Sequence, residues 1–385
     1  MLTAPRVALL LCTMALLLPA ACTRYGAVPL PISQDTLRVT STARNFGIIA
    51  SPGLKLTDVV LRSDKPDPLA GKSVLVISGG GPDGAYAAGY IIGWKQNPSV
   101  PMPQFDIVTG VSTGAILSTF AFLGRPQDEL ALHAYTNITD RDLLKLNEIL
   151  SLLFNESFYQ AAPLRSLLDE YITEETVWRV AEAHGRGRRL YVGTTNLDSG
   201  EFTIWNMGAI AGDETVPITQ RVDLYRDIIQ ASASIPGIFP PVMLRIWSPD
   251  GVYEQMHVDG GCRRQMFVPG DEACEASARS QATGEPRAIY VLRNSRKSLV
   301  AITTVRRHIN ILARAASVAI NESSQYDYLK ISNLKPKCFY ATFIPEDFVS
   351  EPAGGMFDKI YMTQLFEVGS KHGRESYWAV RPKED

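Results

Sequence analysis

A serine occupies a position in the chain where a nucleophile could be held. The pentapeptide Gly110-Val111-Ser112-Thr113-Gly114 has the pattern GxSxG and joins an apolar run, residues 105–111, to a helical stretch, residues 113–123. A serine on such a strand-to-helix turn is presented at the carboxyl end of the strand, where the helix N-terminus faces the reaction centre. The pattern therefore predicts nucleophilic acyl transfer at Ser112. The simpler alternative is a serine that only caps the helix.

A glycine cluster could stabilise the negative charge that develops during acyl transfer. Gly79, Gly80, Gly81 and Gly84 follow a buried-type apolar run, residues 73–78. Consecutive glycines expose backbone N–H groups, which are the donors that an oxyanion needs. The cluster precedes Ser112 by about one strand–helix unit, so both turns are expected at the same edge of adjacent parallel strands. These glycines are therefore predicted to form an oxyanion loop.

The same glycines also match the GxGxxG pattern of a dinucleotide site. That site needs an acidic residue at the end of the second strand, where it holds a ribose hydroxyl. The nearby acid, Asp106, lies instead at the start of that strand, and the far end carries the GxSxG turn. The sequence thus disfavours nucleotide binding.

A serine hydroxyl is a poor nucleophile unless a base accepts its proton. Asp259 opens the turn Asp259-Gly260-Gly261 after a predicted strand, residues 252–258, so its carboxylate is expected at a sheet edge. His372 follows in the chain order of an α/β-hydrolase triad, and His257 would share a strand face with Asp259. A Ser–Asp pair and a triad with His372 both remain open. The other histidines lie in polar or charged helical stretches and are predicted to be solvated: His133, His184 and His308.

Four motifs together resemble those of the patatin-like phospholipases. They are Gly-Gly-Gly-Pro-Asp-Gly (79–84), Gly-Val-Ser-Thr-Gly (110–114), Ala-Ser-Ala-Ser-Ile-Pro-Gly-Ile-Phe-Pro-Pro (231–241) and Asp-Gly-Gly (259–261), in the order seen in that family. The resemblance implies a three-layer α/β fold with a mostly parallel central sheet, a nucleophile elbow and helices on both faces.

The resemblance also implies the chemistry, which is acyl-ester hydrolysis by a Ser–Asp dyad without histidine, cofactor or metal. Ser112 would be the nucleophile, Asp259 the proton acceptor, and the 79–84 glycines the oxyanion loop. The expected substrate is a phospholipid or another acyl ester. Two departures from the family stand out: Pro82-Asp83 where a basic residue is common, and Cys262-Arg263-Arg264 after the Asp-Gly-Gly turn. An inactive scaffold that binds a lipid or a partner is the non-enzymatic alternative.

The N-terminus has the layout of an export signal. Residues 1–21 contain one early positive charge, an apolar run too short to span a bilayer, and small residues before Cys22. Residues 18–22 resemble a bacterial lipobox, which predicts lipidation of Cys22 and a periplasmic or outer-membrane lipoprotein. An ordinary cleaved signal, and hence a secreted protein, is the alternative. Residues 22–71 are predicted to be a tether, and residues 72–385 the hydrolase domain, with a motif core at about 72–300 and a helical part at about 299–385.

Composition limits the remaining function classes. The chain has 385 residues, 38 Lys or Arg against 40 Asp or Glu, and a net charge of −2, which argues against nucleic-acid binding. Its five cysteines lack zinc-ligand spacing, although Cys262 and Cys274 are close enough in sequence to pair. Hydrophobic periodicity further predicts a helix over residues 299–320, with Val305 and Leu312 on one apolar face.

Overall fold

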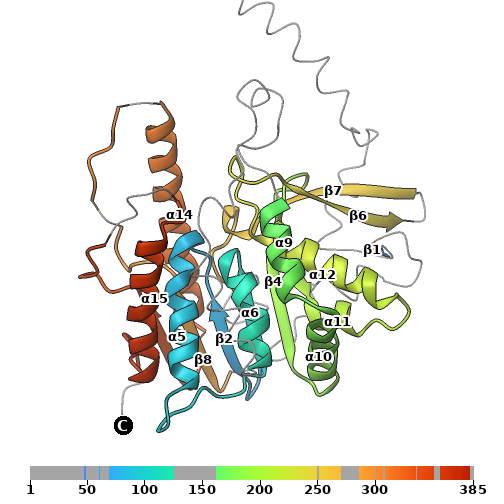
Figure 1. Ribbon diagram of the computed structural model, residues 1–385, viewed down its shortest axis with the longest axis horizontal. Coiled ribbons are helices and arrows are strands. Elements are labelled where there is room, and N and C mark those ends of the chain that lie inside the picture. Colours follow the sequence, from blue (N-terminus) through green and yellow to red (C-terminus); the bar gives the residue numbers. More distant parts are fainter. Residues whose placement is uncertain are drawn as a thin grey trace, which may run out of the picture.

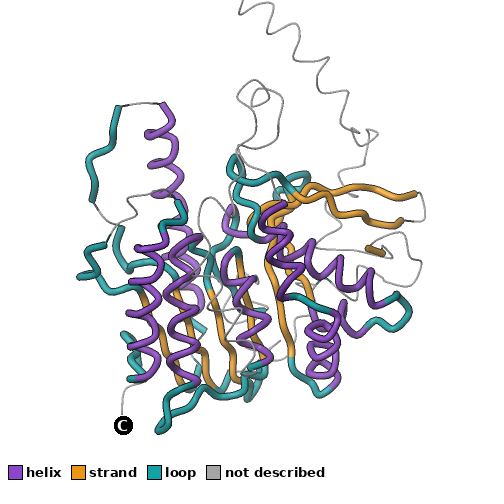
Figure 2. Tube along the Cα trace, viewed as in Figure 1, coloured by secondary structure: helices purple, strands orange, loops and turns teal. Residues whose placement is uncertain are grey.

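The computed structural model describes residues 47–48, 60, 69–124, 162–248, 251–269, 286–299, 301–306, 308–334, 336–350 and 356–381. The predicted signal segment, Cys22 and most of the predicted tether lie outside these residues. Within the tether, residues 47–48 form a strand, Val60 makes a bridge to Trp205, and Leu69 is buried. In the described residues the chain forms a twisted sheet flanked by helices (Figures 1 and 2).

Five parallel strands form the centre of the sheet. Their order is β4-β3-β2-β8-β9. Their bounds are β2 Ser73–Ile77, β3 Ile107–Val111, β4 Arg189–Asn196, β8 Ala288–Arg293 and β9 Cys338–Phe343. The apolar residues of β2 and β3 are buried on both faces, as expected for central parallel strands. Since Ile77 is level with Gly110, the turns that follow β2 and β3 lie side by side.

Antiparallel strands extend the sheet beyond β4. They are β1 Gly47–Ile48, β5 Glu201–Asn206, β6 Val242–Ser248 and β7 Gly251–Asp259. β7 runs antiparallel to β4 and ends at Asp259, which is opposite Thr194. This reversal brings Asp259 to the edge of the sheet where the parallel strands end.

Helices cover both faces of the sheet, so the predicted three-layer α/β fold is confirmed. One large core lies beneath α5 Ala85–Lys95, α6 Thr113–Leu123, α9 Ala162–Tyr171, α10 Glu174–Gly185, α11 Met207–Gly212, α12 Ile218–Ser232 and α15 Lys359–Arg374. Leu75 and Ile77 point into that core, while Val74 and Val76 point to the opposite face. That second face packs on residues 266–268 and on α14 His308–Ser332.

The predicted helix over 299–320 has the wrong bounds and the wrong buried side. α14 begins at His308 and continues to Ser332, so Val305 lies before the helix and is exposed. Tyr328 and Ile331, near the end of α14, are the residues that pack on the sheet, whereas Leu312 is 66% exposed. The apolar periodicity is real, but its residues are not in the core. Among the described helices, none combines the length and apolar character needed to cross a bilayer.

Candidate active site

Ser112 lies on a tight turn between β3 and α6. Its φ of +55° is rare for a residue other than glycine and costs on the order of 1–3 kcal/mol. The flanking glycines make this turn possible. A Cβ on Gly110 would lie 2.3 Å from the carbonyl oxygen of Gly114, and a Cβ on Gly114 would lie 2.3 Å from that of Ile77. The GxSxG pattern is therefore a steric requirement of this elbow.

The structure brings Ser112 and Asp259 together. Ser112 Oγ donates a hydrogen bond of 2.5 Å to Asp259 Oδ2, and each residue is only 5% exposed. The other carboxylate oxygen, Oδ1, accepts from the Gly261 N–H at 2.7 Å. The Asp-Gly-Gly turn therefore orients the carboxylate toward the serine.

Burial changes the acidity of this carboxyl group. It raises the pKa of Asp259 from 3.8 to about 7, against the opposing effect of the hydrogen bonds from Ser112 and Gly261. A carboxylate with a pKa close to neutral pH can both accept and return a proton there. The environment of Asp259 thus suits a general base.

The end of α12 positions both residues. Ser232 Oγ accepts from the Ser112 N–H at 2.9 Å and donates to the Gly193 carbonyl oxygen at 2.7 Å. The Asp259 N–H donates to the Ser234 carbonyl oxygen at 2.9 Å. Ser232 was not among the site residues predicted from the sequence; the small polar Ala-Ser-Ala-Ser stretch of the 231–241 motif was the available signal.

The glycine loop lies beside Ser112, but Gly79 does not have the role predicted for it. The Gly79 N–H donates to the Gln265 carbonyl oxygen at 2.9 Å, so it is not available to an oxyanion. A Cβ on Gly79 would come within 2.6 Å of the Gln265 side chain and 3.2 Å of Ser112 Cβ. Gly79 is needed for close packing rather than as a donor.

Of the next two glycines, Gly81 lines the pocket beside Ser112 and Gly80 precedes it in the loop. A Cβ on Gly80 would lie 2.6 Å from both Cβ and the carbonyl oxygen of Asn294. Gly81 has a φ of +54°, and its carbonyl oxygen accepts from Thr113 Oγ1 at 2.8 Å. Gly84 ends the short 3₁₀ turn Gly81–Gly84 and is the N-cap of α5. Gly80 and Gly81 therefore define the candidate oxyanion position.

Asp83, which occupies the place of the family's basic residue, is directed at α15. Its Oδ1 accepts from the Tyr361 hydroxyl at 2.5 Å. Burial raises the pKa of Asp83 to about 6, with Tyr361 and Arg296 acting in the opposite direction. The acid is therefore held by α15.

An apolar pocket opens at Ser112. Its empty space is about 400 Å³, a volume that includes open solvent at its mouth. Its walls come from the glycine loop, from the elbow and α6, from α9, from the segment after α12 and from the segment before α15: Gly81, Ser112, Thr113, Ile116, Leu164, Leu167, Ala233, Ile235, Phe239 and Phe357. Such a lining suits a hydrocarbon chain.

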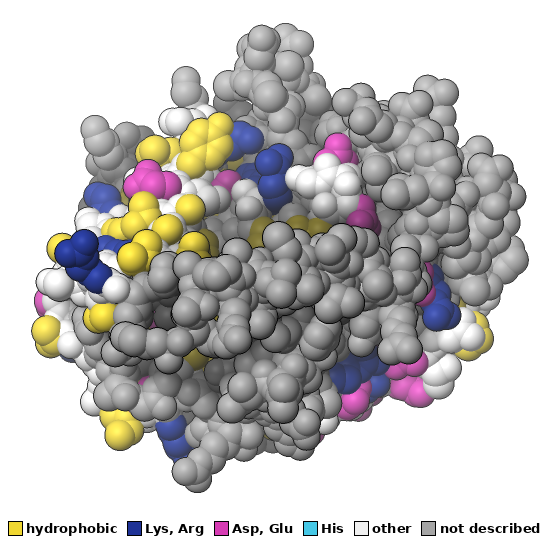
Figure 3. All heavy atoms as spheres, turned by 90° about the horizontal axis from the view of Figure 1, so that it is seen from above, with side chains coloured by type: hydrophobic (Ala, Val, Ile, Leu, Met, Phe, Trp, Pro, Cys, Tyr) yellow, Lys and Arg dark blue, Asp and Glu magenta, His cyan; other side chains and the backbone are white. Residues whose placement is uncertain are grey.

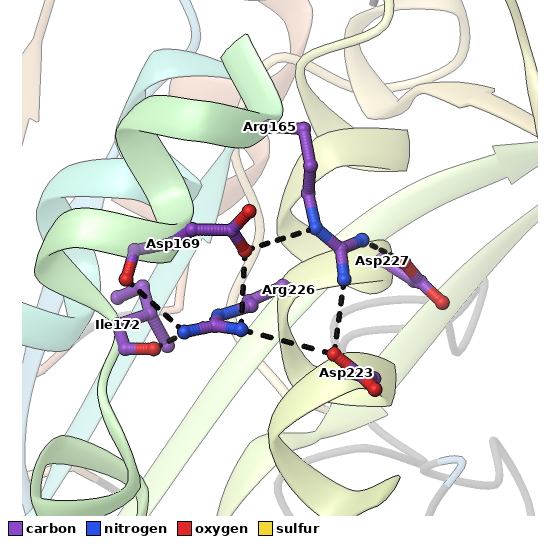
Figure 4. Close-up of polar contacts among 6 residues, drawn as sticks. All are labelled: Arg165, Asp169, Ile172, Asp223, Arg226 and Asp227. Carbon is purple, nitrogen blue, oxygen red and sulfur yellow. Dashed lines mark hydrogen bonds and ion pairs between the residues drawn. The ribbon is translucent and has the colours of Figure 1, made fainter. Parts of the chain in front are cut away.

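An ion cluster fixes the α9 wall of this pocket (Figure 4). Arg165 of α9 pairs with Asp223 at 3.2 Å and with Asp227, both of α12. Arg226 of α12 pairs with Asp169 at 3.1 Å and donates to the Ile172 carbonyl oxygen at 2.9 Å. Leu164 and Leu167 are therefore held against the helix whose end positions Ser112.

The histidines contact other parts of the molecule. His372 Nδ1 lies 3.0 Å from the Tyr86 hydroxyl, and the His372 ring packs on Tyr377. His257 lies 3.0 Å from Thr194 Oγ1 and packs edge-on against Trp205. It is buried, and burial lowers its pKa to about 3. His184 is half-buried beside Gly208 rather than solvated. His133 and the side chain of His308 lie outside the described residues.

Among the described residues, Cys262 and Cys338 form no disulfide. Cys274, the expected partner of Cys262, lies outside the described residues. Within the described part of the chain, no group of three or more His, Cys, Asp or Glu side chains could hold a metal ion.

The site combines a nucleophile elbow with a three-layer α/β sheet, an arrangement that occurs in serine acyl hydrolases. Residues 75–269, about half of the chain, match the family model described as patatin-like phospholipase, and the chain belongs to that family. The crystal structure of VipD from Legionella pneumophila is similar to this structure, with a TM-score of 0.37, 12% identity, and coverage of 80% of this chain and 67% of that chain. A search of curated proteins found no match.

Proposed function

We propose that this protein hydrolyses ester bonds of phospholipids or related acyl lipids with a Ser112–Asp259 dyad. The observation that carries the proposal is the 2.5 Å hydrogen bond between these two buried side chains at the end of an apolar pocket. Family membership supports a lipid acyl hydrolase in general, and the dyad is the specific part of the proposal.

The proposed reaction has two halves. Ser112 Oγ attacks the ester carbonyl while its proton passes to Asp259 Oδ2, and the proton then goes to the leaving alkoxide as the acyl-enzyme forms. A water molecule next attacks the acyl-enzyme and gives its proton to Asp259, which returns it to Ser112 Oγ as the fatty acid leaves. The raised pKa of Asp259 supports both directions of transfer.

The glycine loop would stabilise the tetrahedral intermediates. Gly81 shares the pocket with Ser112, and Gly79 of the same loop packs close to Ser112 Cβ. Removal of one oxyanion donor typically lowers kcat by about 10²–10³. The acyl chain would lie among Ile116, Leu167 and Phe239, on the apolar side of the pocket.

Two alternatives to the dyad are a catalytic triad that includes His372 and an inactive scaffold that binds lipid without hydrolysing it. A triad would require His372 near the serine, and the contacts of that histidine with Tyr86 and Tyr377 favour the dyad. An inactive lipid-binding scaffold would not need an ionisable partner for Ser112. The hydrogen-bonded pair supports catalysis instead.

The place of action is a proposal from the N-terminal sequence. Residues 1–21 support export, and Cys22 supports lipid anchoring in a bacterial periplasm or outer membrane, with secretion as the alternative. Lipid anchoring is tested by metabolic labelling of the parent chain and of the Cys22→Ser variant with a radioactive fatty acid. Equal labelling of the two would exclude Cys22 as the anchor.

The test of function is hydrolysis of a panel of phospholipids and p-nitrophenyl esters by the full chain. We expect Ser112→Ala to lower kcat by about 10⁴ or more with an unchanged melting temperature. Ser99→Ala, at an exposed serine near the opposite sheet edge, is the control and should have no effect. A fluorophosphonate should label the chain but not Ser112→Ala. Labelling that persists in this variant would exclude Ser112 as the nucleophile.

A further inference from the structure

The N-terminal half of α14 extends away from the sheet and exposes apolar side chains. Ile311 is 51% exposed and Leu312 is 66% exposed. Every side chain described between residues 311 and 320 is exposed, apart from half-buried Arg314. Soluble proteins rarely expose contiguous apolar surface of this kind unless it binds something. We call the exposed apolar residues of this region the α14 surface: Leu299, Ile302, Val305, Ile311, Leu312 and Val318.

The helix is amphipathic in a particular way. Between residues 311 and 321 the polar residues are Arg314, Ser317 and Asn321, which are spaced three and four apart and so share one face. All the others in this stretch are Ile, Leu, Val or Ala. An exposed helix with this division can bury its apolar side chains in a membrane interface while its polar face stays in water.

The charge of this region is complementary to an anionic surface. The 28 residues from Asn294 to Asn321 contain no Asp or Glu, although 40 acidic residues in 385 would give about three in such a length. The same stretch contains five basic residues, of which Lys297 and Arg306 are exposed. Basic residues near an anionic lipid surface strengthen binding through electrostatic attraction. A second copy of this chain, whose net charge is −2, offers weaker complementarity.

The α14 surface lies at the same edge of the sheet as the candidate active site. β2, β3 and β8 are parallel, so the segment that leaves β8 at Asn294 starts at the edge where Ser112 follows β3. Figure 3 shows the molecule from above and has hydrophobic side chains gathered on the left, the side on which Figure 1 places α14. A lipid surface touching α14 would thus be on the side of the serine.

The root of α14 is fixed to the catalytic segment. Asp327 pairs with Arg264 at 3.1 Å and accepts from the Gln265 N–H at 2.7 Å, and all three residues are buried. Gln265 in turn accepts from the Gly79 N–H. Because this contact holds the helix relative to the glycine loop, binding at the tip orients the site as well.

We propose that the α14 surface binds anionic phospholipid bilayers, with Leu312 and its apolar neighbours inserted at the headgroup boundary and Lys297 and Arg306 facing lipid phosphates. Membrane binding by the α14 surface would present the pocket to a bilayer, and this role rests on the proposed lipid hydrolysis. Binding itself does not depend on turnover.

The test measures hydrogen–deuterium exchange in the full chain with Ser112→Ala, so that the lipid stays intact. Phosphatidylcholine vesicles are used with and without phosphatidylglycerol. We expect backbone exchange over residues 308–321 to slow by at least about tenfold with the anionic vesicles only, and a peptide around exposed Val100, at the opposite edge, to remain unchanged. Anionic vesicles that bind the chain but leave 308–321 unprotected would overturn the proposal, since another segment would then be the anchor.

Two double variants in the active chain make the test specific. Ile311→Ser with Leu312→Ser, and Lys297→Gln with Arg306→Gln, should each slow hydrolysis of anionic vesicles about tenfold or more. Both should leave hydrolysis of a dispersed short-chain p-nitrophenyl ester unchanged, and Val100→Ser should alter neither rate. Equal rates on vesicles for all variants would refute the α14 surface. If sedimentation shows that the parent chain is a dimer and the Ile311→Ser, Leu312→Ser variant is a monomer, a second copy of the chain covers the α14 surface instead of lipid. A chain that hydrolyses neither substrate yet shows the protection would refute the proposed function alone.

Discussion

Replacement of Asp259 by Asn should have opposite effects on catalysis and on stability. The buried carboxyl has a pKa of about 7 in the folded chain against 3.8 ordinarily, which corresponds to about 4 kcal/mol. Because the folded pKa is raised, the folded state binds the proton more tightly than the unfolded state. The stabilisation from this group is fully present below pH 3.8 and is lost as the pH rises through about 7.

An Asn side chain has nearly the same shape and stays neutral at every pH. Its Oδ1 can still accept from the Gly261 N–H, and its amide can donate to Ser112 Oγ. At about pH 8 the free energy of unfolding of the variant should therefore exceed that of the parent chain by up to about 4 kcal/mol. This difference should narrow steadily toward about pH 5. Turnover should be lost, because an amide cannot accept the serine proton.

The assay is denaturant unfolding of both chains at several pH values between about 5 and 8, together with kcat/KM of the parent. Below about pH 7 the parent's kcat/KM should fall about tenfold per pH unit as Asp259 becomes protonated. Glu175→Gln, at an exposed carboxylate on α10, is the control for the loss of one negative charge. A stability gain that is the same at every pH, or turnover in Asp259→Asn near the parent's rate, would refute the assignment of Asp259 as a buried base.

Three further substitutions test other parts of the site. Gly80→Ala should lower kcat by about 10²–10³ in a folded chain, because its Cβ would meet Asn294 at 2.6 Å and displace the loop; unchanged turnover on an ester panel would contradict the oxyanion role. His372→Ala should keep kcat within a few-fold, since its contacts are with Tyr86 and Tyr377, and a loss of about 10⁴ with unchanged circular dichroism would support a triad instead. Arg226→Ala should raise KM for long-chain esters more than it lowers kcat, because it loosens the α9 wall; a pure kcat effect would show that the ion cluster acts on the serine rather than on the pocket.

The sequence predicted the parts of the site that depend on local geometry. A GxSxG turn between a strand and a helix needs both glycines for steric reasons, so the pattern and the structure coincide at Gly110 and Gly114. The parallel order of the strands that precede the glycine loop and Ser112 also followed from the strand–turn–helix repeats. The fold class was predictable for the same reason, since each of these strands is a short apolar run.

Contacts between distant segments were not predictable. The Gly79 N–H is occupied by Gln265, which is far away in the chain and shows no pattern that pairs the two. The hydrogen bond from Ser112 to Ser232 likewise joins β3 to the end of α12. The wrong prediction of a buried apolar face on α14 has a different cause. Apolar periodicity indicates an amphipathic helix, but it does not say whether the apolar face packs on the protein core or is exposed at the surface.

The environment of Asp259 supports the proposed dyad, in which a serine hydrolase would work without histidine. A carboxylate with an ordinary pKa is a weak base near neutral pH, and histidine usually supplies the missing basicity. Here β7 runs back along β4 and places the carboxyl in a site where burial raises its pKa to about 7, close to the value of an imidazole. The unfavourable burial of a charge is the source of the basicity, so the elements that exclude water from Asp259 serve catalysis as directly as the carboxylate does. Any change that opens the pocket beside Ser112 to water should therefore weaken the base while leaving the 2.5 Å contact in place.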